Sequence, residues 1–530
     1  MTKLTYGVIA AAAAFLLFFN LGDRYLWMDE ACTATLAVNI TEFGVPKAVD
    51  GKNHITVFGA EVDENEDNVW TWSPWLGEYL AALSFLAFGV STTAARLPFA
   101  VFALLTVVLL AYTAYRVFED HRVAIVAMAL CVGCALFLLH GRQCRYYAVA
   151  LFAQTGLVCG FHNLLRGRRT RGVLQFTSCL VIQFYVNYIF VPGNIAAALL
   201  TGALVSRRYR GLFTHLCVSA AALAVVALPW IAYARPWRAN PVLARFIPLE
   251  NLVYYAIETH YHIIPLVIFL LPLLVRAGRL VRTGRGVGTS GDKEPRTVPA
   301  IQKSVTLYLW ITISTQLLIL SLVLVGATRY QVVLVPLFLL LGADVVVRSV
   351  RSAALRYVLV IVLVTSNAVS VAAPIPARWF FPNAPPHHLE SPLLLFLRDI
   401  TSEYTGRTQQ VVQFLRSSGT PDQSVLVLDT EFPLIFHTGM RVIDARLRVP
   451  GAPVTADWIL PQPASAINWQ PPLQLAPNLA QSYDRMVIEI NKTAYGENMP
   501  EPHKHQYFTN PEREEFVLYR RRVENNAPPR

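Results

Sequence analysis

The chain has 530 residues, of which 54% are hydrophobic and 15% charged, and its mean hydropathy is +0.43. Soluble domains carry about a quarter charged residues, so this composition excludes an ordinary water-soluble protein. The formal net charge of +11 does not indicate a nucleic-acid partner, because the Arg residues cluster in short loops between apolar runs, which is typical of membrane topology signals. We therefore expect a multi-pass protein surrounded by membrane lipids, with no nucleic acid.

Apolar runs of transmembrane length recur along the chain. The first could be a signal peptide, but no small-x-small cleavage site follows it, so we expect an uncleaved helix. A stretch at 74–89 is too short and mixed to predict a span; it fits an interfacial or re-entrant segment. About eleven spans are predicted, at 6–21, 97–115, 123–140, 146–165, 173–190, 192–206, 212–233, 262–281, 304–326, 331–347 and 356–374.

The loops between these runs predict an orientation in the plasma (inner) membrane. With the N-terminus in the cytoplasm, every strongly basic loop falls on the cytoplasmic side, as the positive-inside rule requires. The first loop, 22–75, then lies outside, and it holds ten acidic against three basic residues. An odd number of spans also places everything after residue 374 outside. The basic loops are 166–171, 206–210, 276–296 and 348–356.

The region after the last expected span has the pattern of a small folded domain. Residues 406–419 predict an amphipathic helix that ends at a Gly C-cap. Residues 424–429 and 484–490 predict buried strands, and 515–521 a half-buried strand. We expect two domains: a transmembrane domain, 1–375, with the outer-face loop 22–75, and an extracytoplasmic C-terminal α/β domain, 376–530.

Cysteine and histidine give weak signals for a metal. Most of the seven Cys lie in apolar runs, which favours packed thiols over a disulfide framework or a metal site. His260 and His262 fall in a predicted loop, where we expect solvated side chains, and a divalent ion would need more acids beside them. No metal ligand is predicted and no cofactor is assigned, although a divalent metal ion stays open.

Polar side chains gather where spans meet the outer face. Such residues are costly near the membrane and are functional candidates by default. Adjacent carboxylates follow the first span, and guanidinium groups with aromatic neighbours occur later in the chain. The candidates are Asp29, Glu30, Arg142, Arg145, Tyr146, Asn187, His260, Arg329 and Tyr330.

Three short motifs carry a resemblance to a known family. They are "RYLWMDEACTATLA" followed by the segment beginning "SPWLGEYLAALSF", then "RQCRYYAVALFAQTG", then "GATRYQVVLVPLFLLLGADVV". In this order the motifs resemble those of GT-C glycosyltransferases related to protein O-mannosyltransferases and lipid A aminoarabinose transferases. The resemblance covers about residues 5–375. The chain differs in having Trp72-Ser73-Pro74 where many relatives have His-Pro-Pro, and Asn187 where a His is often found.

The resemblance implies a GT-C-like fold of about 11 transmembrane helices and an enzyme that transfers a sugar from a polyprenyl-phosphate donor on the outer face. Asp29 matches the essential acid of the family, with Glu30 supporting it, and Arg329 matches the residue near the lipid phosphate. The acceptor, whether protein, lipid or glycan, is unknown. Some relatives carry a second acid where this chain has Arg142 and Arg145.

The residues themselves agree with this chemistry. An arginine fork stabilises a leaving phosphate, and a carboxylate can act as base for an incoming hydroxyl. Simpler interpretations stay open: Asp29 and Glu30 as a pair that caps an interfacial helix, and the three arginines as side chains that reach lipid headgroups. At the level of function, the alternatives are a transporter or flippase of lipid-linked sugars and a non-catalytic cell-envelope scaffold.

Overall fold

The computed structural model describes residues 2–57, 59–238, 248–276, 298–322, 326–375, 381, 388–427, 431–444, 455–461, 479–493 and 498–522. The chain forms two compact units. The helical unit comprises Met1–Phe19, Ser73–Gly77 and Phe99–Leu397, and the sheet unit comprises Asn20–Trp72, Glu78–Pro98 and Arg398–Arg530. Each unit is described by itself.

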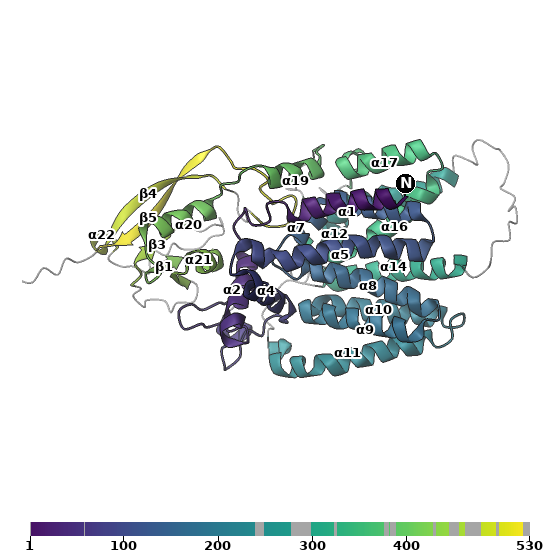
Figure 1. Ribbon diagram of the computed structural model, residues 1–530, viewed down its shortest axis with the longest axis horizontal. Coiled ribbons are helices and arrows are strands. Elements are labelled where there is room, and N and C mark those ends of the chain that lie inside the picture. The colour runs from purple at the N-terminus through teal and green to yellow at the C-terminus, as the bar shows by residue number, and fades with distance from the viewer. Residues whose placement is uncertain are drawn as a thin grey trace, which may run out of the picture. The chain divides into compact units, whose positions relative to one another are not determined.

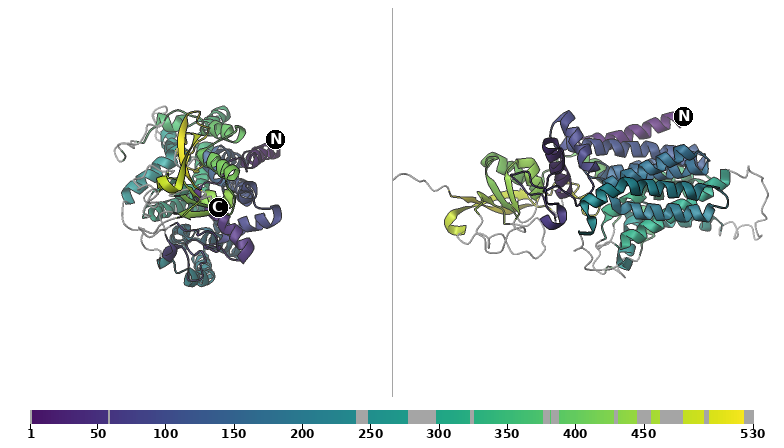
Figure 2. Two further views of the ribbon diagram at one scale, coloured as in Figure 1. Left: turned by 90° about the vertical axis from the view of Figure 1, so that its left-hand side faces the viewer. Right: turned by 90° about the horizontal axis from the view of Figure 1, so that it is seen from below.

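The helical unit is a bundle of apolar helices that run side by side (Figures 1 and 2). Helix α8 is buried along its whole length and packs against α9, α11, α14 and α16. The elements are α1 (Thr2–Phe18), α5 (Thr92–Phe118, its first turns in the sheet unit), α6 (His121–Gly133), α7 (Ala135–Gly141), α8 (Tyr147–Leu165), α9 (Arg169–Val186), η1 (Tyr188–Phe190), α10 (Val191–Val205), α11 (Leu212–Ala234), η2 (Pro236–Arg238), α12 (Pro248–His262), η3 (Leu266–Leu270), α14 (Val298–Ser321), α15 (Thr328–Gln331), η4 (Val332–Leu334), α16 (Val335–Ser349), α17 (Ala353–Thr365), α18 (Ala368–Ala372) and the start of α19 (Pro392–Thr401).

The expected count of about eleven spans is not confirmed by the described residues. Among the described residues, six helices are long and apolar enough to cross a membrane, or eight if each of two bent pairs is one span. The bends are 67° between α6 and α7 and 89° after α12. The expected run 262–281 therefore begins at a bend, and its residues beyond 276 lie outside the described part of the chain. The first and last expected spans, α1 and α17, are shorter apolar helices.

One end of the helical unit gathers basic loops. Gln302, near the start of α14, donates from Nε2 to Phe118 O at the end of α5 at 2.9 Å. Arg348, near the end of α16, donates to Gln302 Oε1 at 3.0 Å. Arg166, after α8, pairs with Glu119. The segments 166–171 and 348–356 therefore lie at a common end of the bundle, whereas the basic loop 276–296 lies, beyond residue 276, outside the described residues. The orientation of this end toward the cytoplasm stays a prediction.

A buried amide cluster crosses three helices of the bundle. Asn194 of α10 donates from Nδ2 to Gln154 Oε1 of α8 at 2.9 Å and to Gln183 Oε1 of α9 at 2.6 Å. Gln183 donates to Gln154 at 2.8 Å, and Gln154 to Asn194 at 3.1 Å. All three side chains are fully buried. Because the three amides hydrogen-bond one another, the cost of burying them in an apolar bundle is offset, and the bonds fix the register of the helices.

The sheet unit contains one mixed five-stranded sheet in the order β2-β1-β3-β5-β4 (Figure 1). Strand β1 pairs in parallel with β2 and β3, and β5 pairs antiparallel with β3 and β4. The strands are β1 (Ser424–Val427), β2 (Arg441–Asp444), β3 (Trp458–Ile459), β4 (Tyr483–Asn491) and β5 (Arg513–Arg521); the helices are α2 (Met28–Phe43), α3 (Ala60–Asp63), most of α4 (Leu76–Phe88), α20 (Arg407–Ser418), α21 (Glu431–Thr438) and α22 (Leu479–Ser482).

The C-terminal elements largely match their expected positions. The helix at 406–419 is confirmed as α20, although Gly419 is extended rather than left-handed. Strand β1 is buried as expected. Strand β4 is not: its residues are mostly exposed or half-buried, and Val487 is 41% exposed. The reason is that β4 lies at the edge of the sheet, where one neighbour is missing.

The first loop folds with the C-terminal elements. Helix α2 packs against α21. Asn53 accepts from Val442 N at 2.7 Å, and Lys52 Nζ donates to Pro421 O at 2.9 Å. These contacts explain why residues 20–72 belong to the same compact unit as 398–530. The expected division of the chain at residue 375 stays a prediction.

Candidate active site

Asp29 and Glu30 lie in the first turn of α2, which begins at Met28. Negative side chains are favoured there by the partial positive charge of the helix N-terminus. Successive residues of a helix point about 100° apart, so the two carboxylates face different surroundings. Glu30 is fully buried, whereas Asp29 is half-buried.

Glu30 forms a bidentate ion pair with Arg96, from the first turns of α5. Arg96 Nε donates to Oε1 at 2.8 Å, and Nη2 donates to Oε2 at 2.7 Å. Trp27 N also donates to Glu30 Oε2, at 3.4 Å. A buried carboxylate that is paired in this way is fixed in position. Glu30 therefore holds the start of α2. The catalytic role expected for Asp29 stays a prediction.

In the helical unit, three expected segments come together at one end of the bundle. Helices α7 and α8, which flank Arg142, Arg145 and Tyr146, pack against η4, directly after α15. The ring of Tyr146 lies 6.2 Å from that of Phe190, in the turn that follows Asn187. The motifs "RQCRYY" and "GATRYQ" therefore lie at the same end of the bundle.

The arginines of this end have different surroundings. Arg142 Nη1 donates to Leu16 O, in the last turn of α1, at 2.8 Å, which binds that helix end. The guanidinium of Arg145 lies 5.5 Å from the ring of Tyr146. The guanidinium of Arg329 lies 5.5 Å from the ring of Tyr330, and Arg329 is half-buried.

The turn that carries Arg329 is held by α12. Thr328 Oγ1 donates to Glu258 Oε2 at 2.7 Å, and the hydroxyl groups of Tyr254 and Thr328 are 2.7 Å apart. Asn251 of α12 accepts from Gly326 N at 3.0 Å and donates to Ser321 O at 3.1 Å. The sequence does not predict this support, because its pattern indicates a loop around His260, which lies on α12.

His260 and Asn187 have structural partners. His260 is on α12, not in a loop, and is buried; its Nε2 lies 3.0 Å from Ser370 O, and its Nδ1 lies 3.1 Å from Leu266 N. Both ring nitrogens thus bind backbone groups. Asn187 Oδ1 accepts from Ile189 N at 3.1 Å and caps η1. These contacts account for both residues without a substrate.

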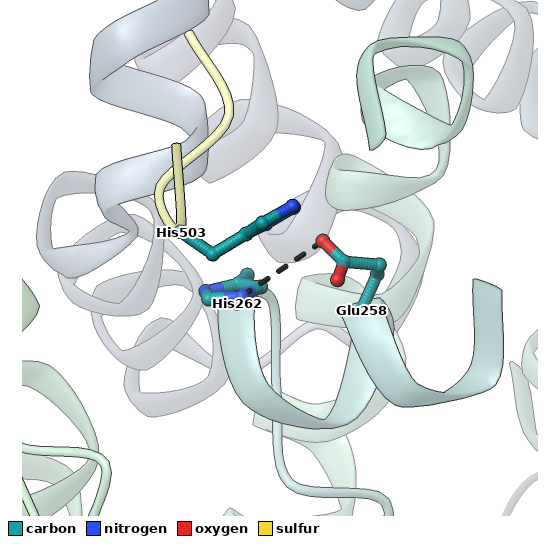
Figure 3. A group of neighbouring side chains, drawn as sticks. All are labelled: Glu258, His262 and His503. Atoms are coloured by element: carbon teal, nitrogen blue, oxygen red, sulfur yellow. Dashed lines mark ion pairs between the residues drawn. The ribbon is translucent and has the colours of Figure 1, made fainter. Parts of the chain in front are cut away.

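The open question of a divalent metal concerns Glu258 and His262, one helical turn apart on α12. Glu258 Oε2 lies 3.8 Å from His262 Nε2, and both side chains are nearly buried (Figure 3). His503, also drawn in Figure 3, belongs to the sheet unit. A carboxylate and an imidazole suit zinc, but such a site takes three or four protein ligands. The pair fits part of a metal site, and metal dependence stays a prediction.

Comparison with known proteins gives a fold. No protein-family model matches the chain, and no curated protein matches it. The structure resembles that of ArnT from Cupriavidus metallidurans bound to undecaprenyl phosphate, with 12% identity, a TM-score of 0.53 and 99% of each chain covered. It also resembles apo ArnT from the same organism, with 13% identity, a TM-score of 0.51, and 84% of this chain and 86% of that chain covered. The likeness confirms the fold of the GT-C aminoarabinose transferases that the sequence motifs resembled.

Proposed function

We propose that this protein is a membrane glycosyltransferase that takes a sugar from a polyprenyl-phosphate carrier. The observation that supports it best is the likeness, over 99% of both chains, to ArnT bound to undecaprenyl phosphate. Several apolar helices of spanning length are consistent with a protein of the plasma membrane. The sugar and the acceptor are not specified by this proposal.

In the proposed reaction Asp29 is the carboxylate that accepts the proton of the incoming hydroxyl or orients it. Its carboxylate is half-buried in the first turn of α2, where a negative side chain is favoured by the helix N-terminus. Glu30 has a positioning role, because its ion pair with Arg96 fixes the first turn of α2. We propose that this positioning of the first turn is the way in which Glu30 supports Asp29.

Arg329 is proposed to bind the carrier phosphate. A guanidinium presents paired N–H donors that match phosphate oxygens, and the bonds from Thr328 to Glu258 and Tyr254 hold its turn in place. Arg145, Tyr146 and Tyr330 belong to the same end of the bundle and are proposed to line the donor site. Because the basic loops gather at the opposite ends of these helices, we propose that the reaction takes place on the outer face.

The test combines a donor assay with cell chemistry. The purified full-length protein in lipid nanodiscs is given undecaprenyl-phosphate-linked pentoses and hexoses together with a cell-envelope extract that supplies acceptor hydroxyl groups. Release of undecaprenyl phosphate and transfer of the sugar to the extract are measured. In parallel, glycans and lipids from cells that lack the protein are compared by mass spectrometry with those from cells that carry Asp29→Asn. We expect the same glycan or lipid to lose its sugar in both. A loss in the deletion strain but not with Asp29→Asn would favour a flippase or a scaffold.

A further inference from the structure

The turn that leads to Asp29, residues 20–27, connects the end of α1 to the start of α2 and belongs to no helix or strand. Its backbone groups are bound instead by side chains from distant parts of the sheet unit. Arg96 Nη1 donates to Leu21 O at 3.0 Å and to Arg24 O at 2.9 Å. The conformation of this turn therefore depends on tertiary partners.

Two of those partners come from the C-terminal region. Leu26 N donates to His437 Nε2, on α21, at 3.1 Å. Asn498 Nδ2 donates to Tyr25 O at 2.6 Å. The Tyr25 ring also stacks on the His437 imidazole, with ring centres 4.1 Å apart. Consecutive residues of the turn are thus held by two segments that lie more than 400 positions away in the sequence.

The side chain of Arg24 binds the same C-terminal segments. Its Nη1 donates to Gln506 O at 2.7 Å and to Asn498 Oδ1 at 3.1 Å. The guanidinium pairs with Asp399 and lies 3.7 Å from the centre of the Tyr404 ring. A charged group that is buried with this many partners fixes geometry rather than merely adding stability.

His437 acts here as a neutral acceptor. Because Nε2 accepts the Leu26 N–H, the ring proton belongs on Nδ1. Burial lowers the pKa of His437 to about 3, with further lowering by the charges of Arg416 and Arg96. The imidazole therefore keeps its lone pair for Leu26 at neutral pH.

We propose that the C-terminal region positions the catalytic carboxylate of Asp29, and that His437 and Asn498 are the positioning residues of this region. The small sheet is then a platform that sets the turn before Asp29. The structural part of this inference stands by itself; its catalytic consequence rests on the proposed function. A misplacement of about 1 Å at a reacting group costs about a hundredfold in rate, so such a platform has a measurable effect.

The experiment measures hydrogen exchange of peptides that cover residues 20–30 in the full-length protein in nanodiscs. His437→Leu removes the hydrogen-bond acceptor of Leu26 N–H with a side chain of similar size. His437→Gln keeps a side-chain acceptor at a similar distance from the backbone. His54→Leu is the matched control: it removes a histidine of the same unit that pairs with Glu64 at 2.9 Å. We expect exchange to rise about fivefold in His437→Leu, and to stay near wild type in His437→Gln and His54→Leu.

Catalysis gives the second measurement, with undecaprenyl-phosphate-linked pentoses and hexoses as donors. In His437→Leu we expect kcat to fall about ten- to a hundredfold while the donor KM changes by less than about threefold; His437→Gln should recover most of kcat. If His437→Leu does not fold, Asn498→Ala tests the same turn by removing the hydrogen bond to Tyr25 O. Unchanged exchange at 20–30 in the folded variant overturns the inference. If exchange at 20–30 rises in His437→Leu but the wild-type protein transfers no sugar, the proposed function is overturned and the structural inference stands.

Discussion

Asp29 and Glu30 are neighbours in sequence but differ in what surrounds them. Glu30 is tied to Arg96 by two hydrogen bonds inside the sheet unit, whereas Asp29 keeps a half-buried carboxylate. Their substitutions should therefore fail in different ways, one in catalysis and the other in stability.

We expect Asp29→Asn to lower kcat by about 10²–10⁴-fold with a nearly unchanged donor KM and thermal midpoint. Glu30→Gln removes the negative charge from the buried ion pair with Arg96, which costs about 3–5 kcal/mol, so its main effect should be a lower thermal midpoint. Donor assays and unfolding scans on the same preparations separate the two. An active Asp29→Asn beside a stable but inactive Glu30→Gln would exchange the roles assigned here.

Arg329 gives the second prediction at this scale. A charge-assisted hydrogen bond to phosphate contributes about 1.5–3 kcal/mol, or about ten- to a hundredfold in affinity. Arg329→Ala should raise the donor KM by that factor, and Arg329→Lys should recover only part because the paired donors are lost. Arg142→Lys is a useful comparison, since Arg142 binds the end of α1. A donor KM that stays at the wild-type value in Arg329→Ala removes this residue from the donor site.

His437 gives a pH prediction. Its folded-state pKa of about 3 lies below the ordinary 6.5, so the unfolded chain binds more protons between these values. The contribution of neutral His437 to the free energy of unfolding is complete above about pH 6.5. It is lost as the pH falls toward the folded-state pKa, at about 1.4 kcal/mol per pH unit. When the pH is lowered from about 7.5 to about 5, the thermal midpoint of the wild type should fall by more than that of His437→Gln. Equal losses in the two proteins would show that His437 does not carry this dependence.

At the scale of elements, the amide cluster of α8, α9 and α10 joins helices that are otherwise apolar. Asn194→Leu leaves the Gln154 and Gln183 amides with an unmet hydrogen bond each, at about 1–3 kcal/mol per group. We expect a lower thermal midpoint in detergent. The matched control is Ala196→Leu, on the exposed face of the same helix, which should behave as wild type. If Asn194→Leu is as stable as this control, the cluster does not hold the three helices together.

Elements also differ in how far their sequence determines them. Helix α20 and strand β1 follow from local patterns, and both were predicted. The exposure of β4 was not, because burial depends on which strands lie beside it, and β4 has β5 on one side alone. The bend of 89° after α12 likewise leaves no mark in hydropathy. The predicted span 262–281 therefore includes only the last residue of α12.

At the scale of the whole molecule, the basic loops predict the side of the membrane on which each region lies. Ser417→Cys, exposed on α20, should react with an impermeant maleimide in intact cells; Arg207→Cys, exposed after α10, should react only once the membrane is opened. The native background is low, since six of the seven cysteines are buried and Cys217 can be replaced by Ser. The reverse labelling pattern would invert the topology and the side of the proposed reaction.

The sequence by itself determined that this is a helical membrane protein, where its apolar segments run, and which short motifs carry its acids and arginines. These properties are local, because hydropathy, helix length and charge are read residue by residue. Only the tertiary structure decided which of those residues contact one another and what each contact holds in place. Arg96 reaches Glu30 across 66 positions, and His437 reaches Leu26 across 411. No periodic pattern encodes such pairs, because the position of a buried hydrogen bond is set by how distant elements pack.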